Sequence, residues 1–174
     1  MLTVQAALEL VHRHLGTSPR ARHSIFVGFV MHHLAEPLMA DGTLWEITGL
    51  CHDLDFEATA DDPTRHGLLA AQWLAGELPE AALLAIRAHD HRSGVTADTP
   101  IANALKLSDA LAVISEALGD RTMAVLDNPD AEALLALEFA TRPYLPALLL
   151  AHSRRLGITL PAVARICALA PPPC

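Results

Sequence analysis

Six histidine and aspartate residues are candidate ligands for a metal ion. They are His23, His52, Asp53, His66, His89 and Asp109. Imidazole and carboxylate ligands without thiolate suit divalent Mn, Fe, Co, Ni or Zn. Such an ion lowers the pKa of a bound water toward about 7 and so generates hydroxide at neutral pH. The sequence therefore predicts a catalytic site that holds one or two divalent metal ions.

The dipeptide His52-Asp53 is the centre of this prediction. It follows the apolar segment 44–50, so that an imidazole and a carboxylate at the end of one helix can reach the same ion. If two ions bind, the carboxylate of Asp53 bridges them. The first ion is then held by His23, His52, Asp53 and Asp109. The second ion is held by Asp53, His66 and either His89 or His91.

Asp109 is a carboxylate on the apolar side of a predicted helix. Ile101, Leu105 and Val113 lie on the same side. Burying a carboxylate is costly unless the group is paired or coordinates a metal. A metal ligand is one explanation of this position. The alternative is an ion pair with Lys106 or an arginine.

Each histidine also has an ordinary structural interpretation. His23 is explained by hydrogen bonds within the core, and His66 by capping of a helix. His89 and His91 are explained by a helix end, where the helix dipole favours a positive charge. The combination of imidazoles and carboxylates on convergent helix faces favours the metal site.

The elements that must position these residues are helices. Ala and Leu dominate, aromatic residues are only 4% and β-branched runs are scarce, so the chain is predicted to be all-α. One domain spans 1–174, with the candidate ligands within about 20–115 and further helices at about 120–170. The predicted helices cover 1–15, 20–39, a segment ending at 52–53, 64–77, a segment from Leu78-Pro79 to 89, a segment beginning at Pro100, 130–140, 143–156 and 160–169. The last three helices complete the bundle or form a homodimer face.

The composition excludes several classes of protein. A net charge of −8 argues against binding to a nucleic-acid polymer, which requires basic patches. No apolar run approaches the ~20 residues that a membrane helix needs. Segment 1–15 lacks a basic start and carries Glu9, so it is predicted to be a helix and not a signal peptide. Three cysteines at unrelated spacings predict neither disulfides nor a thiolate zinc site, which favours a cytoplasmic location.

The order His23, His52-Asp53, Asp109 resembles the H…HD…D motif of the HD-domain superfamily of metal-dependent phosphohydrolases. His66 and His89 resemble the longer pattern of its two-metal members. The strings His52-Asp53-Leu54-Asp55-Phe56-Glu57, Pro63-Thr64-Arg65-His66-Gly67 and Ala85-Ile86-Arg87-Ala88-His89 look most like a group of small bacterial HD proteins. The resemblance covers about 20–115 and implies an HD-domain-like helical bundle with a catalytic metal.

Two departures from the family pattern bear on the substrate. Many members read HD-x-G-K, but Asp55 and Phe56 stand where the glycine and the phosphate-binding lysine would fall. The stretch 89–91 differs from the His-His pair of members that cleave cyclic dinucleotides, and the Gly-Tyr-Pro signature is absent. That class of substrate is therefore disfavoured.

Other charged residues are then needed around the substrate. Arg65, Arg87 and Arg92 are the nearest cations by sequence, with solvated surface arginines as the alternative. Asp55 and Glu57 are candidates for orienting a metal-bound water or for general acid catalysis. Their alternative interpretation is that of loop acids without a catalytic role.

The predicted function is hydrolysis of a small phosphorylated metabolite or nucleotide by metal-bound hydroxide. Asp53, Asp55 and Glu57 are the predicted catalytic residues, and Arg65 and Arg92 the predicted substrate-binding residues. One alternative keeps the metal and changes the reaction to that of the di-iron oxygenases in the wider superfamily. The other is a non-catalytic helical module that binds a metal or ligand.

Overall fold

The computed structural model describes residues 2–170, which form an all-α structure, as the sequence predicts. The α-helices are α1 (Val4–Leu15), α2 (Pro19–Ala35), α3 (Gly42–Cys51), α4 (Leu68–Trp73), α5 (Glu80–Ala88), α6 (Pro100–Leu118), α7 (Thr122–Leu126), α8 (Ala131–Glu138), α9 (Tyr144–Leu156) and α10 (Leu160–Leu169). Short 3-10 turns join several of them, and residues 2–170 contain no β-strand. Within this range no helix is long and apolar enough to cross a bilayer. Met1 and the Pro-rich end of the chain lie outside the described residues.

Side-chain caps fix where the helices near the candidate ligands begin. The hydroxyl of Ser18 accepts a hydrogen bond from the amide of Ala21 at the start of α2. Thr99 does the same for α6 by accepting from Ala102, and a proline occupies the first turn of both helices. These starts set the register that places His23 one turn into α2.

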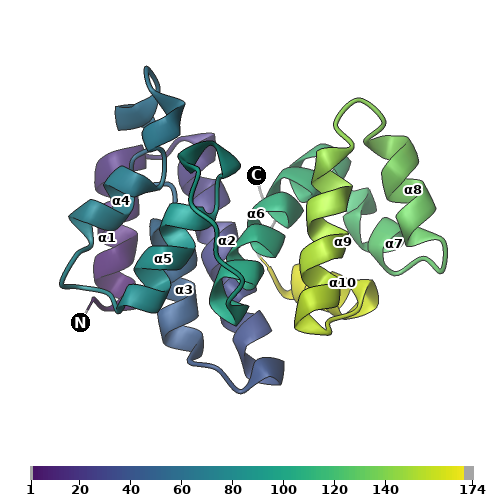
Figure 1. Cartoon of the computed structure of the whole chain (residues 1–174). Helices are drawn as coiled ribbons and strands as arrows, with labels where there is room; N and C mark the ends of the chain where they lie inside the picture. Colours follow the sequence, from purple (N-terminus) through teal and green to yellow (C-terminus); the bar gives the residue numbers. More distant parts are fainter. Residues whose placement is uncertain (1, 171–174) are drawn as a thin grey trace.

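Helix α6 lies between the N-terminal helices α1–α5 and the C-terminal helices α7–α10 (Figure 1). It contacts α2 and α5 on one side and α9 on the other, while α10 contacts α2 and α7. The C-terminal helices therefore complete one bundle within the chain. Whether they also form a dimer face stays a prediction.

Helices α2 and α3 approach one another closely because two glycines face each other. A Cβ at Gly49 would lie 2.7 Å from the Cα of Gly28 and would collide with it. A Cβ at Gly28 would lie 2.8 Å from Leu50 Cγ. Without side chains at these two positions, α2 and α3 bring His23 and His52 into the same part of the core.

The predicted helix over 64–77 is wrong at both ends, because α4 covers only Leu68–Trp73. Gly67 has φ 76° and begins the helix from a left-handed conformation. A Cβ there would lie 2.5 Å from the carbonyl oxygen of Ile86, so only glycine permits this approach to α5. His66 therefore lies in an extended turn before α4, which directs its ring toward His89.

Two smaller differences concern helix ends. The predicted helix over 20–39 ends at Ala35 and continues as a 3-10 turn over Glu36–Leu38, because Pro37 cannot donate a helical hydrogen bond. Helix α7 was not predicted, since its five residues are too few to show a periodic pattern.

A buried histidine in the C-terminal half predicts how stability depends on pH. His152 of α9 donates from Nδ1 to the side-chain oxygen of Asn103 on α6 at 2.8 Å. Burial and the positive charges of Lys106 and Arg155 lower the pKa of His152 to about 4. The unfolded chain, with a pKa near 6.5, binds more protons between these values, so this contribution is present above pH 6.5 and lost as pH falls toward 4.

We therefore expect His152→Gln to flatten the pH dependence of stability. The free energy of unfolding of the unmodified chain should lose about 1–2 kcal/mol more than the variant between pH 7 and pH 5. Urea unfolding at the two pH values measures this difference, with the exposed His12→Gln as the control. Equal losses in the unmodified chain and the His152 variant would contradict the prediction.

Candidate metal centre

Six side chains from five parts of the fold converge at one place. His23 comes from α2, His52 from the C-cap of α3 with Asp53 directly after it, His66 from the turn before α4, His89 from the C-cap of α5 and Asp109 from α6. These are the six ligands predicted from the sequence. Their ring nitrogens and carboxylate oxygens form two adjoining groups.

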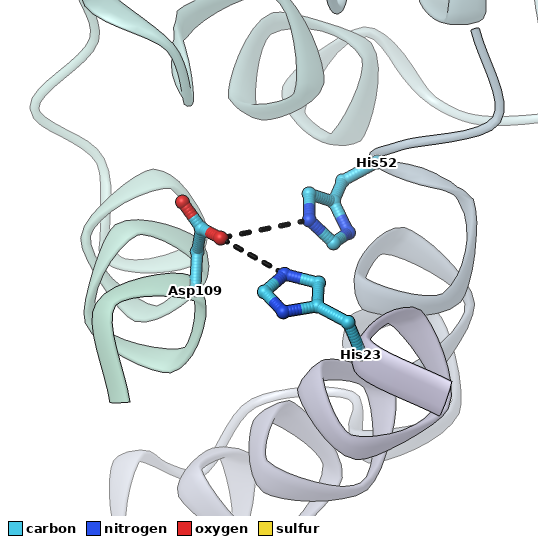
Figure 2. Close-up of side chains that lie close together, drawn as sticks. All are labelled: His23, His52 and Asp109. Atoms are coloured by element: carbon cyan, nitrogen blue, oxygen red, sulfur yellow. Dashed lines mark hydrogen bonds and ion pairs between the residues drawn. The ribbon is translucent and has the colours of Figure 1, made fainter. Parts of the chain in front are cut away.

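The first group joins His23, His52 and Asp109 (Figure 2). Nε2 of His23 lies 3.0 Å from Oδ1 of Asp109, and Nε2 of His52 lies 4.0 Å from the same oxygen. Oδ2 of Asp53 lies 3.4 Å from His52 Nε2 and 3.8 Å from His23 Nε2. Two imidazole nitrogens and two carboxylate oxygens therefore surround one point.

The second group uses the other oxygen of Asp53. Nε2 of His66 lies 3.0 Å from Oδ1 of Asp53, and Nε2 of His89 lies 3.5 Å from it. The two imidazole nitrogens are 3.2 Å apart. The two oxygens of one buried carboxylate thus face different groups of histidines, which is the arrangement of a bridging ligand.

The partners of Nδ1, the ring nitrogen on the side away from the two groups, determine whether Nε2 of each histidine is free to bind a metal ion. Nδ1 of His52 lies 2.7 Å from the carbonyl oxygen of Gly49, and Nδ1 of His89 lies 2.7 Å from that of Ile86. A carbonyl only accepts, so Nδ1 carries the proton and Nε2 of the neutral ring is an unprotonated acceptor. Nδ1 of His66 lies 2.9 Å from a carboxylate oxygen of Asp55. Nδ1 of His23 lies 3.6 Å from a carboxylate oxygen of Glu116.

Nitrogen lone pairs and carboxylate oxygens repel each other unless a proton or a metal cation lies between them. The buried Nε2 of His52 has no hydrogen-bond partner among the described residues. A metal ion bound to the two groups would satisfy this nitrogen and offset the repulsion. The fold therefore brings together buried and half-buried His and Asp residues that can hold a metal ion: His23, His52 and Asp109 in one set, and His52, Asp53 and His89 in another.

The pKa shifts have the same electrostatic origin. Burial opposes ionisation of Asp53, but the surrounding histidines hold its pKa well below its ordinary value. Burial likewise opposes protonation of His23 and His66, but the adjoining carboxylates raise the pKa of each to about 9. Burial dominates at His52 and lowers its pKa to about 4. The ionised carboxylates thus attract positive charge to a buried location.

A cleft of about 410 Å³ opens onto this centre. Asp53, His66, His89 and Asp109 line it. The side chain of Asp109 is 32% exposed, so it faces the cleft instead of the core that its sequence position suggested. Its ion pairs within residues 2–170 join it to the two histidines and not to Lys106.

Arg20 is a further cation in this cleft that the sequence analysis missed. It donates from a guanidinium nitrogen to Oδ2 of Asp53 at 3.0 Å, and the guanidinium lies 4.1 Å from the centre of the Phe56 ring. Arg20 precedes His23 by three positions and therefore shares its helix face, a signal that was available from the sequence. Glu116 was missed too, although it lies two turns beyond Asp109 on α6.

Asp55 lies behind the metal centre. It is fully buried, its Oδ2 accepts from the backbone amide of Ala70 at 3.0 Å, and its Oδ1 faces His66. Glu57 is exposed and lines a smaller cavity of about 250 Å³ beside His23. The structure thus places these two predicted catalytic acids on different sides of the centre.

Of the two predicted substrate-binding arginines, only Arg92 lies at the cleft. Arg92 lines the cleft and is paired with Asp90. Arg65 is exposed and does not line the cleft, and Arg87 pairs with Glu80. His91 lines the outer cleft, but its side chain is 95% exposed, and His89 is the residue that reaches Asp53.

The position of Asp55 predicts a specific effect on metal affinity. Asp55→Asn keeps the side-chain shape but removes the charge that faces Nδ1 of His66. Because outer-sphere partners of metal-bound histidines are worth roughly 10–100-fold in affinity, the binding constant of the ion held by His66 should fall by about that factor. Calorimetric titration with Mn²⁺ or Zn²⁺ measures both constants, with the exposed Asp61→Asn as the control. Unchanged constants in Asp55→Asn would show that Asp55 does not support the site.

No family model, curated protein or solved structure matches this chain. What the site can do is therefore inferred from its own residues and their geometry.

Proposed function

We propose that this chain is a metal-dependent phosphohydrolase that acts on a small phosphate ester. The observation that carries the proposal is the convergence of four imidazoles and two carboxylates suited to a metal. Both carboxylates and two of the imidazoles line the cleft, where the guanidinium of Arg20 contacts Asp53. A phosphate group combines negative charge with several oxygens, so it binds best where metal ions and arginines meet. We further propose that the chain is a member of the HD-domain superfamily, because its candidate ligands occur in the order of that family's motif.

Arg20 supports a phosphate substrate in particular. Phe56 stands where many HD-domain proteins have a phosphate-binding lysine, and the guanidinium of Arg20 lies over the ring of Phe56. We infer that Arg20 supplies from α2 the positive charge that the missing lysine would have supplied. Arg92, at another wall of the cleft, would add a second cation.

The ligands divide between two ions of Mn, Fe, Co, Ni or Zn in this proposal. His23, His52, Asp53 and Asp109 would hold the first ion, and Asp53, His66 and His89 would hold the second. Bound there, the ions would lower the pKa of a coordinated water toward about 7 and stabilise charge on the phosphoryl oxygens.

The protein residues have separate roles in the reaction. Asp53 bridges and orients both halves of the site, and the carbonyls of Gly49 and Ile86 hold His52 and His89 with Nε2 facing inward. Asp55 acts as a positioning residue behind His66. Arg20 binds the phosphoryl oxygens, and Glu57 stays a predicted proton-transferring group beside His23.

Phosphate release from a panel of phosphomonoesters tests the proposal. The metal-loaded protein should release inorganic phosphate, chelation should abolish the release, and added Mn²⁺ or Co²⁺ should restore it with or without oxygen. Product formation that requires both iron and oxygen would replace the hydrolase with a di-iron oxygenase. Protein that retains metal but is inert toward the whole panel would support a non-catalytic module.

A further inference from the structure

Helix α9 supplies an apolar wall to the cleft at the metal centre. Its first residue, Tyr144, is 58% exposed, and Leu148 one turn later is 39% exposed. Both side chains line the cleft, together with Leu145 of the same helix and Val113 of α6. Figure 1 shows α9 running beside α6, and the two helices contact each other.

The other walls of the same cleft are charged. Arg20 and Arg92 line it, and Asp90 pairs with Arg92. A cleft lined both by cations and metal-ligating groups and by exposed apolar side chains of another helix suits a ligand with two chemically different ends. Its volume of about 410 Å³ lies within the roughly 300–1,000 Å³ of small-molecule sites.

Large apolar side chains that remain exposed on a cleft wall indicate a contact surface for a ligand. The ring of Tyr144 and the branched end of Leu148 are four positions apart on one helix, so their side chains lie on the same face. Such a pair can cover a flat apolar group. Most of its surface offers no hydrogen bonds to a sugar alcohol or another small polyol.

We propose that Tyr144 and Leu148 form a specificity wall for the alcohol part of the substrate. The preferred substrate is then a phosphate monoester that carries an aromatic ring or a similarly flat apolar group. This inference rests on the proposed function, because the metal centre and Arg20 hold the phosphate end. It also gives the C-terminal helices, which lie outside the HD-like segment, a part in substrate choice.

Two non-hydrolysable ligands separate the contributions of the two ends. Methylphosphonate and benzylphosphonate present the same anionic group to the metal centre, and only the second presents a ring. We expect benzylphosphonate to bind the Mn²⁺-loaded protein about 5–20-fold more tightly in a calorimetric titration, as ring burial against Tyr144 predicts.

The double variant Tyr144→Ser/Leu148→Ser should lose most of this preference and keep its affinity for methylphosphonate. Both side chains are partly exposed, so the fold should persist, and circular dichroism checks that it does. Leu137→Ser, at an exposed leucine on α8 away from the cleft, is the matched control and should keep the preference.

The remaining outcomes separate the two proposals. Equal affinity for both phosphonates in the unmodified protein, or an unchanged preference in the double variant, would overturn the specificity wall and leave the hydrolase intact. If neither phosphonate binds the metal-loaded protein and no ester is hydrolysed, both the proposed function and the specificity wall are contradicted.

Discussion

Replacing Asp53 by alanine is expected to abolish metal retention and phosphate release together. Its Oδ1 lies within 3.5 Å of His66 and His89, and its Oδ2 lies 3.4 Å from His52. The two oxygens of this one carboxylate therefore contact histidines of both groups. Loss of the metal removes several kcal/mol of transition-state stabilisation, so turnover should fall at least about 10³-fold.

Metal content per chain and the rate of phosphate release are measured on the same preparation of Asp53→Ala. Asp61→Ala is the matched control, because it removes an exposed acid from the same loop. Circular dichroism establishes that the variant is folded. Full metal content with full activity in Asp53→Ala would mean that the ligand assignment is wrong.

Replacing Arg20 by alanine should reduce turnover while the protein keeps its metal. Arg20 contacts Oδ2 of Asp53 from the cleft and is not itself a candidate metal ligand. Removing a charged donor that faces the reacting group costs roughly 10²–10³-fold in rate. Arg20→Lys should recover only part of this loss, because an ammonium cannot bind two phosphoryl oxygens in the paired geometry of a guanidinium.

Arg65→Ala is the control for this experiment. Arg65 is exposed and lies outside the cleft, so its removal should leave kcat and KM nearly unchanged. If Arg20→Ala instead lost metal in proportion to activity, Arg20 would act by holding Asp53 in place. In that case the phosphate contact would have to come from Arg92 or another residue.

The six candidate ligands could be selected from the sequence, because each occurs near the end of an apolar segment or on an apolar helix face. Three- and four-residue spacing places His23 on the buried side of α2, as predicted. The same spacing suggested the core for Asp109, but its side chain is 32% exposed and lines the cleft. The pairing of His23 with Asp109 at 3.0 Å depends on contact between helices far apart in the sequence. The HD-like pattern was the only indication of that contact.

The parts that sequence reasoning missed depend on tertiary contacts. His66 lies outside the predicted helix because the backbone of Gly67 packs closely against the carbonyl of Ile86. The spacing of apolar residues cannot predict that contact. Asp55 turns away from the cleft because the amide of Ala70 offers it a buried hydrogen bond. The wall formed by α9 likewise exists only because α9 is seated against α6.

The most direct test of the metal centre is a crystal of Mn²⁺- or Zn²⁺-loaded protein, with diffraction recorded on both sides of the absorption edge of the metal. We expect an anomalous peak enclosed by His23, His52, Asp53 and Asp109, and a second peak between Asp53, His66 and His89 if two ions bind. No peak at either place, or density confined to surface residues such as His32 and Glu46, would contradict this expectation.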